Sequence, residues 1–204
     1  MRVLIGTYRR RTHVTDALAS LDAMVTGVTD LVFIDDSGDP DTTGWLASYG
    51  KVIDVGGRGY NAAMKAACAA AEGQQCLWLE EDFTFTVRTH LAALAEILWH
   101  RPYLAQVALL RGPHFPTEHA HGGLIEALEA KGHVFTDVNG VLEQTATFTC
   151  NPSVWRGEVF ASGWPDGRWS EDRKRDQLLA AGYRFGYLPG IRVNHTGERS
   201  GHDY

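Results

Sequence analysis

The chain has 204 residues, and its hydrophobic content of 44% is typical of an ordinary soluble globular protein with one full core. Nineteen basic against twenty-five acidic residues give a formal net charge of −6. This balance argues against nucleic acid or an anionic membrane as the main partner, because such partners are bound by broad basic faces. We expect a single domain over residues 1–204 and no nucleic-acid partner.

The cysteines and the apolar segments give expectations about location. Cys68, Cys76 and Cys150 are too few and too irregularly spaced for a disulfide framework, and none forms a C-x-x-C metal pair. A reducing cytoplasm is the simplest location. No segment approaches about 18 consecutive apolar residues, and MRVLIGTYRRR is too short for a secretory signal, so we predict no transmembrane segment.

Strand and helix patterns alternate through the first hundred residues. This alternation predicts an α/β fold with a Rossmann-like, mainly parallel sheet flanked by helices, in which ligands bind beyond the carboxyl ends of the strands. The expected strands cover 2–7, 31–34, 52–55 and 76–79, and the expected helices cover 12–24, 60–73 and 87–100. The helix over 87–100 is predicted to bury Leu91, Leu94, Leu98 and Trp99.

The second half has a less regular pattern. The dipeptide Asn139-Gly140 predicts a hairpin turn, and the stretch GPHFPTEHAHGG predicts a mobile loop because of its prolines and glycines. Short strands are expected over 103–110 and 148–155, a helix over 170–182, and a final extended segment over 183–195.

Three consecutive acids, Glu80, Glu81 and Asp82, follow the apolar run CLWL. Carboxylates at the end of a buried strand are costly unless a positive group lies among them. Oxygen ligands of this kind suit Mg²⁺ or Mn²⁺, which share their remaining positions with water and substrate phosphates. The alternative is a solvated acidic turn that caps the following helix.

Polar residues also follow the second and third predicted strands. Asp35 and Asp36 begin the turn DDSGD, where they either simply form the turn or accept hydrogen bonds from a base N–H or a ribose hydroxyl. Arg58 and Lys65 flank the glycine-rich start of a helix. Backbone amides at a helix start with a nearby guanidinium form an anion site, although a glycine-rich turn alone is a weak signal.

The stretch RWSEDRKRDQLL predicts a helix with Ser170 as its N-cap. Glu171 and Asp172 then lie in the first turn, where the helix dipole favours ionised carboxylates. That placement is a sufficient structural explanation for both acids. The functional alternative makes Asp172 a general base that takes a proton from an alcohol.

Four histidines are candidate ligands. His195 follows an apolar strand and is either a surface histidine or a neutral metal ligand. His114, His119 and His121 share one stretch with Glu118. Since that stretch is rich in proline and glycine, we expect a flap that becomes ordered on ligand binding rather than a zinc site.

Taken in this order, the motifs resemble those of the family-two nucleotide-sugar glycosyltransferases, which have the GT-A fold. RVLIGTYRR is similar to that family's first strand, and VFIDDSGD to its second strand with the base-binding aspartate. AAEGQQCLWLEED is similar to the stretch that leads into the D-x-D metal motif. SEDRKRDQLLAAGYRFGYLP resembles the catalytic "ED" helix, and VNH the late histidine, so the resemblance covers nearly the whole chain.

The resemblance implies an inverting, metal-dependent transfer of a sugar from a nucleoside diphosphate donor, most simply a UDP-sugar, to an acceptor hydroxyl. Residues 1–100 would bind the nucleotide, and 101–204 the acceptor, which is a glycan, lipid, protein or small molecule. Trp155, Trp164 and Trp169 either stack on a sugar ring or fill the core. The expected positions are Thr7, Tyr8, Arg9, Asp35, Asp36, Arg58, Lys65, Glu80 and Glu81 for the nucleotide, Asp82 and His195 for Mn²⁺ or Mg²⁺, and Asp172 or Glu171 for the acceptor proton.

The sequence departs from the family pattern in three places. E-E-D stands where D-x-D is usual, an Arg-Asn pair after the third strand is missing, and the segment after the ED pair is slightly shorter, which leaves the choice between Glu171 and Asp172 open. A nucleotidyltransferase is a second reading, but it calls for a glycine-rich basic loop where Thr7 and Tyr8 stand. A non-catalytic module that binds nucleotide sugars or glycans is a third.

Overall fold

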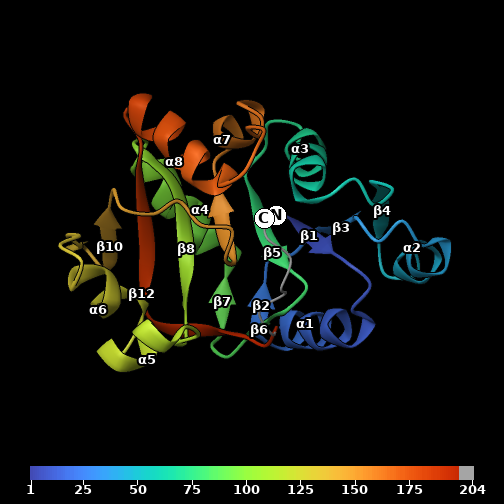
Figure 1. Ribbon diagram of the computed structural model, residues 1–204, viewed down its shortest axis with the longest axis horizontal. Helices are drawn as coiled ribbons and strands as arrows, with labels where there is room; N and C mark the ends of the chain where they lie inside the picture. Colours follow the sequence, from blue (N-terminus) through green and yellow to red (C-terminus); the bar gives the residue numbers. More distant parts are fainter. Residues whose placement is uncertain (198–204) are drawn as a thin grey trace.

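The computed structural model describes residues 1–197. Its centre is a ten-stranded sheet with the order β4-β3-β1-β5-β11-β8-β12-β10-β9, and β6 pairs with β12 beside this path (Figure 1). A separate two-stranded sheet joins β2 and β7. The strands are β1 (Arg2–Thr7), β2 (Val25–Thr26), β3 (Asp30–Asp35), β4 (Lys51–Asp54), β5 (Cys76–Glu80), β6 (Phe83–Phe85), β7 (Thr89–His90), β8 (Leu104–Arg111), β9 (Thr136–Val138), β10 (Val141–Gln144), β11 (Ser153–Trp155) and β12 (Arg184–His195).

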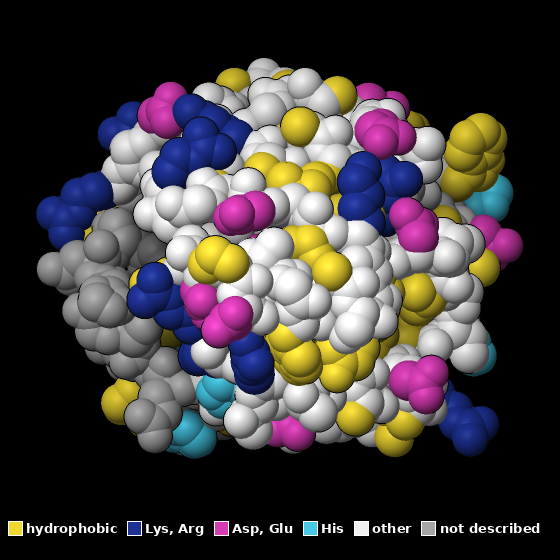
Figure 2. Space-filling model, turned by 90° about the vertical axis from the view of Figure 1, so that its right-hand side faces the viewer, with side chains coloured by type: hydrophobic (Ala, Val, Ile, Leu, Met, Phe, Trp, Pro, Cys, Tyr) yellow, Lys and Arg dark blue, Asp and Glu magenta, His cyan; other side chains and the backbone are white. Residues whose placement is uncertain are grey.

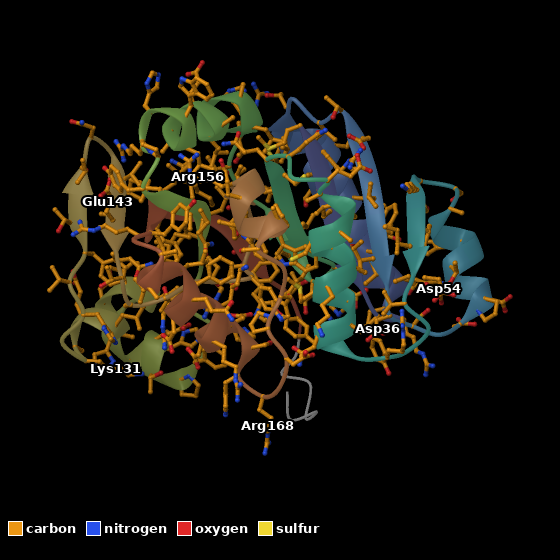
Figure 3. All side chains as sticks on the ribbon, turned by 90° about the horizontal axis from the view of Figure 1, so that it is seen from above. Asp36, Asp54, Lys131, Glu143, Arg156 and Arg168 are labelled. Atoms are coloured by element: carbon orange, nitrogen blue, oxygen red, sulfur yellow. The ribbon has the colours of Figure 1, made fainter. Side chains whose placement is uncertain are left out.

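Helices cover both faces of this sheet, with α4 on one side and α3 and α8 on the other (Figure 3). None of the helices in residues 1–197 is long and apolar enough to cross a membrane. The helices are α1 (Arg11–Met24), α2 (Pro40–Leu46), α3 (Tyr60–Ala70), α4 (Leu91–His100), α5 (Pro116–His121), α6 (Leu124–Glu129), α7 (Gly157–Ala161) and α8 (Ser170–Ala180).

The first half forms the parallel part of the sheet, as its alternating pattern predicts. Strands β4, β3, β1 and β5 are neighbours and run parallel. Val3, Leu4 and Ile5 of β1 are fully buried, which explains why this strand reads as a continuous apolar run rather than an alternating one. Cores lie on both faces, one under α1 and α4 and the other under α3, α7 and α8.

The second half completes the sheet with mixed pairing. Strand β11 lies antiparallel between β5 and β8, whereas β12 runs parallel to β8. The predicted hairpin of β9 and β10 is confirmed, and both turn residues, Asn139 and Gly140, have positive φ angles of 48° and 77°. Tight hairpin turns of this type require positive φ at both positions.

Two expectations about helices are wrong. Trp99 was expected to face inward with Leu94 and Leu98, but it is 78% exposed. Ser170 is not the N-cap of α8; it is the buried first helical residue, and Trp169 holds the N-cap position with φ of 56°. Positive φ is unusual for a residue with a large side chain. The preference of serine for the N-cap position therefore did not predict that Trp169 occupies it.

Three short helices, α2, α6 and α7, were not expected at all. For α2 the sequence does contain a signal within DDSGDPD, which we interpreted only as a turn. Asp39 is the N-cap and its carboxylate accepts hydrogen bonds from the amides of Asp41 and Thr42, each at 3.3 Å, with Pro40 at the first helical position. Aspartate followed by proline is a favourable helix start.

Charged side chains of both signs are interspersed on the face that carries α2 and β4 (Figure 2). This distribution agrees with the small negative net charge of the sequence.

Candidate active site

The carboxyl ends of the four parallel strands lie at one level of the sheet. Thr7 of β1 is in register with Asp35 of β3, and Asp35 is in register with Asp54 of β4. On the other side of β1, Gly6 is paired with Glu80, the last residue of β5. The convergence of polar strand ends expected from the sequence is therefore confirmed.

The positive group among the acids of β5 is Arg10. Its Nε lies 2.6 Å from Oε1 of Glu81, and its Nη2 lies 3.0 Å from Oδ2 of Asp82. The amide of Tyr8 donates a second hydrogen bond to Glu81, at 2.7 Å to Oε2, while the Tyr8 ring is 47% exposed. The turn after β1 is thereby tied to the end of β5.

Arg10 was not among the site residues expected from the sequence. The available signal was the run Arg9-Arg10-Arg11 immediately after β1, because β1 and β5 are neighbouring parallel strands whose ends share one edge of the sheet. A basic turn after one strand and an acidic turn after its neighbour are expected to meet.

Glu81 and Asp82 have pKa values shifted in opposite directions. Burial raises the pKa of Glu81 to about 7, although the Tyr8 amide and Arg10 oppose the shift. Burial also favours a higher pKa for Asp82, but hydrogen bonds and charges from His195 and Arg10 outweigh it and hold the pKa below its ordinary value. Asp82 is therefore the more readily ionised of the two.

Asp82 and His195 lie against each other, with 3.4 Å between Oδ2 and Nε2. Strand pairing explains this position, since His195 of β12 is in register with Phe83 of β6, and the two rings are stacked with centroids 4.6 Å apart. The ring of His114 lies close to the same imidazole, at 4.1 Å between centroids.

Asp82 and His195 fit a divalent cation. Carboxylate and imidazole are both ligands for Mn²⁺, and two protein ligands leave room for phosphate oxygens and water. A Cβ at Gly197 would collide with Oδ2 of Asp82, so a side chain at this position would displace that carboxylate. Within residues 1–197 no group of three His, Cys, Asp or Glu side chains is arranged to hold a metal ion.

A second acidic cluster joins β5 to α8. Oε1 of Glu171 accepts a hydrogen bond from the Tyr60 hydroxyl at 3.1 Å. Burial raises the pKa of Glu171, with hydrogen bonds from Cys150 and Tyr60 opposing the shift. Burial, followed by the charges of Asp82 and Glu171, also raises the pKa of Glu80 well above its ordinary value. Glu171 and Glu80 therefore lie close enough to repel each other.

Helical spacing explains why Glu171 rather than Asp172 joins this cluster. Glu171 shares a face of α8 with Lys174 and Leu178, which are both buried. Asp172 lies on the outer face, where its side chain is 55% exposed and forms an ion pair with Arg175 at 2.7 Å. The structure thus brings one acid of the ED pair to the strand ends and directs the other to solvent.

Asp35, the last residue of β3, and Asp36, which follows it, both accept hydrogen bonds from nearby turns. Asp35 is fully buried and accepts from the Ser37 amide at 3.0 Å and the Thr43 hydroxyl at 2.7 Å, which fixes the turn and α2. Asp36 lies at the same edge beside the start of α3 (Figure 3) and accepts from the Gly59 amide at 3.1 Å. It is 8% exposed, and burial raises its pKa.

The remaining expected nucleotide residues line the same turns, with one exception. The Thr7 hydroxyl donates to the carbonyl of Ile34 in β3 at 3.5 Å. The side chains of Arg9 and Arg58 donate to backbone carbonyls of the turns after β3 and β4, at 2.8 and 2.6 Å. Lys65 instead lies in the second turn of α3, where its ammonium is 2.5 Å from Asp166 in the segment before α8. The structure therefore connects Lys65 to the second half of the chain.

The stretch over 112–123 is more ordered than a mobile loop, because it contains α5. Arg111 and Glu118 form a buried, bidentate ion pair with distances of 2.6 and 2.7 Å, which anchors this helix to the end of β8. Its proline stands at the first helical position, where proline is tolerated. Of the three histidines, His114 contacts His195, whereas His119 and His121 are exposed.

The three tryptophans considered from the sequence have different environments. Trp155 and Trp164 are buried in the core under α3, α7 and α8, at 0% and 6% exposure. Trp169 is 70% exposed and lies two residues before Glu171.

No family model matches the sequence, and no curated protein matches it. Solved structures do match. The mannosyltransferase PcManGT from Pyrobaculum calidifontis, in complex with GDP-Man and Mn²⁺, is similar with a TM-score of 0.70 and 16% identity over 98% of this chain. The fold is that of the GT-A glycosyltransferases.

Two further structures agree with this assignment. S. aureus TarS 1–349 in complex with UDP-GlcNAc has a TM-score of 0.68 and 17% identity over 99% of the chain. GalNAc-T7 with UDP, GalNAc and Mn²⁺ has a TM-score of 0.67 and 15% identity over 95%. The chain spans 57%, 59% and 43% of PcManGT, TarS 1–349 and GalNAc-T7, less than two thirds of each.

Proposed function

We propose that the chain is a glycosyltransferase that moves a sugar from a nucleoside diphosphate donor, a UDP-sugar, to an acceptor hydroxyl. One observation supports this above all others. Glu171 of α8 meets the acidic end of β5 at the carboxyl edge of a GT-A sheet. Ligands of open α/β sheets bind beyond this edge. A ligand bound there would lie near the Glu171 carboxylate.

The nucleotide lies across the ends of β1 and β3 in this proposal. Thr7 and Asp36 contact the base, and the exposed ring of Tyr8 offers it an aromatic face. Arg9 and Arg58, at the neighbouring turns, approach the diphosphate as guanidinium donors suited to phosphate oxygens. These positions follow the resemblance and agree with the location of the turns.

Asp82 and His195 hold Mn²⁺ or Mg²⁺ in this proposal, with Glu80 placed toward the ribose or a water of the ion. A bound divalent cation neutralises charge on the departing diphosphate. The two ligand atoms, Oδ2 of Asp82 and Nε2 of His195, lie 3.4 Å apart.

Glu171 is the general base in this proposal. The acceptor oxygen forms a bond to the anomeric carbon as the bond from that carbon to the diphosphate oxygen breaks, and the acceptor proton passes to the Glu171 carboxylate. A carboxylate whose pKa lies above its ordinary value accepts a proton more readily, and burial gives Glu171 that property. Attack from the side opposite the diphosphate inverts the anomeric configuration.

The acceptor binds on the side of residues 101–197 in this proposal. Trp169, exposed and two residues from the base, is the aromatic surface available to an acceptor sugar. Trp155 and Trp164 are excluded from such a role because they are buried.

The decisive experiment compares Glu171→Gln with Asp172→Asn in a panel of UDP- and GDP-sugars with Mn²⁺, Mg²⁺ or a chelator. Glu171→Gln is expected to lower turnover about 10²- to 10⁴-fold while the donor-induced thermal shift stays that of the wild type. Asp172→Asn, whose acid is exposed, serves as the control and keeps its turnover. Full turnover by Glu171→Gln contradicts the role of this base.

Two other results test the stereochemistry of the transfer and the alternative functions. The anomeric configuration of the product, determined by NMR, tests inversion, and retained configuration contradicts it. Donor stabilisation without any hydrolysis or transfer by the wild type indicates a non-catalytic binding module, and nucleotide transfer from a nucleoside triphosphate indicates a nucleotidyltransferase.

A further inference from the structure

Arg10 contacts Glu81 and Asp82, the two acids that directly follow β5. Its guanidinium bridges Oε1 of Glu81 and Oδ2 of Asp82, at 2.6 and 3.0 Å. Its side chain is 38% exposed, whereas those of Glu81 and Asp82 are 2% and 9% exposed. The acids are therefore held in place by a guanidinium that itself reaches solvent.

The same oxygen of Asp82 faces Arg10 and His195. Nη2 of Arg10 lies 3.0 Å from Oδ2, and Nε2 of His195 lies 3.4 Å from it. A divalent cation of the size of Mg²⁺ would bind that oxygen at about 2.0–2.1 Å, close to the guanidinium that now contacts it. Two positive charges at this distance repel each other strongly in a partly buried site. Arg10 and the cation therefore compete for Asp82.

A displaced Arg10 has an acceptable partner when a nucleoside diphosphate is present. The side chain stands at the turn before α1, one residue ahead of Arg11, and is long enough to turn from the acids toward solvent. Phosphate oxygens accept paired hydrogen bonds from guanidinium as carboxylates do. The diphosphate also brings negative charge that offsets the charge of the incoming cation.

We propose that Arg10 is an exchangeable counter-ion, which occupies Asp82 in the free protein and passes to the donor diphosphate when the cation takes its place. This inference rests on the proposed function of the site. It predicts that the cation alone binds weakly and that cation and nucleotide strengthen each other's binding. Coupling of this kind between two ligands is typically about 5- to 150-fold and is reciprocal.

The test measures Mn²⁺ binding, from the EPR signal of the free ion, with and without saturating UDP. The variants are Arg10→Gln and its matched control Arg11→Gln. Arg11 is the next residue, its guanidinium packs over the Trp45 ring at 5.4 Å, and its replacement removes the same charge. Without UDP, Arg10→Gln is expected to bind Mn²⁺ about tenfold more tightly than Arg11→Gln, and UDP is expected to strengthen its Mn²⁺ binding less than that of the control.

Equal Mn²⁺ affinities of the two variants without UDP overturn the inference, as does the absence of Mn²⁺ binding in all proteins. Arg10→Lys provides a second comparison, since one ammonium does not span both carboxylates as the guanidinium does. It is expected to bind Mn²⁺ more tightly than the wild type, and an affinity equal to the wild type contradicts the proposal.

Failure of the donor proposal gives a different pattern. If no nucleotide sugar or nucleotide binds to any of the proteins while Arg10→Gln still binds Mn²⁺ more tightly than Arg11→Gln, the donor assignment is wrong and the competition at Asp82 stands. If sugar transfer occurs and the two variants bind Mn²⁺ equally, only the role of Arg10 is refuted.

Discussion

Replacement of Glu118 by Gln tests the ion pair that anchors α5 beside the site. The Glu118 carboxylate accepts two hydrogen bonds from Arg111, at 2.6 and 2.7 Å, and two from the amides of His114 and Phe115, at 2.8 and 3.1 Å. Both charged side chains are almost fully buried. The amide of glutamine keeps the shape but leaves the Arg111 charge without its counter-ion.

The magnitude follows from the pKa of Glu118. Burial acts to raise this pKa, but the Arg111 hydrogen bonds and the two amides outweigh it and lower the pKa from 4.5 to about 2. At about 1.36 kcal/mol per pKa unit, the ionised carboxylate contributes about 3.4 kcal/mol to the free energy of unfolding. Breaking a buried ion pair typically costs about 3–5 kcal/mol, which agrees.

The pH dependence has a definite sign. Because the folded-state pKa is lowered, the contribution is fully present above pH 4.5 and is lost as the pH falls through about 2. Linkage leaves about 1.4 kcal/mol of it at pH 3. Urea unfolding of the wild type and Glu118→Gln at pH 7 and pH 3 measures the difference directly. The midpoint of thermal unfolding at pH 7 is expected to be about 7–14 °C lower for the variant.

The control for this change is Glu129→Gln, which makes the same substitution at an exposed position of α6. Its free energy of unfolding is expected within about 0.5 kcal/mol of the wild type. If Glu118→Gln is equally neutral at pH 7, or if its deficit stays the same at pH 3, the ion pair does not stabilise this region as described.

Two further substitutions test separate features. Lys174 is fully buried, and its Nζ donates to the carbonyls of Val159 and Gly163 and to the hydroxyl of Ser162. Lys174→Met is therefore expected to lower the free energy of unfolding, measured by urea titration, by about 2–4 kcal/mol. The control is Lys131→Met at an exposed position, and an unchanged urea midpoint of Lys174→Met contradicts the prediction. Gly197→Ala places a Cβ against Oδ2 of Asp82. It is expected to weaken Mn²⁺ binding, measured by EPR, about 10- to 100-fold. The control is Gly44→Ala, whose Cβ meets no atom within 4 Å and which is expected to leave Mn²⁺ binding unchanged.

Much of the first half was predictable because its structure is determined by neighbours in sequence. The expected strand over 2–7 coincides with β1, and the expected helix over 12–24 begins one residue after α1 does. Short apolar runs that alternate with helical patterns leave few topologies open, and a parallel sheet brings its strand ends to one edge. For this reason the sequence predicted that the acids after β5 lie at the same edge of the sheet as the turns after β1 and β3.

Other features depended on contacts that the sequence pattern does not encode. Trp99 follows the helical spacing of a core residue and is nevertheless exposed, because α4 packs through Leu94 and Leu98. The stretch over 112–123 has the composition of a loop, but the buried partner of Glu118 stabilises a helix there. Contacts with elements distant in sequence decide whether a side chain is buried and whether a short helix forms, and the local composition does not predict these contacts.

The choice between Glu171 and Asp172 is similar. Both acids are adjacent in sequence and both suit the first turn of a helix, so residue type and spacing do not separate them. The rotation of α8 about its axis separates them, and that rotation is set by Lys174 and Leu178 packing into the core.

The sequence by itself determined the alternating α/β pattern, the parallel strands and the meeting of acidic and polar turns at one edge of the sheet. Only the tertiary structure decided that Arg10 neutralises Glu81 and Asp82, that Glu171 rather than Asp172 faces Glu80, and that His195 lies against Asp82. Periodicity and turn chemistry act between near neighbours and are written locally in the chain, whereas charge pairing depends on which side chains the packed elements bring within a few ångströms.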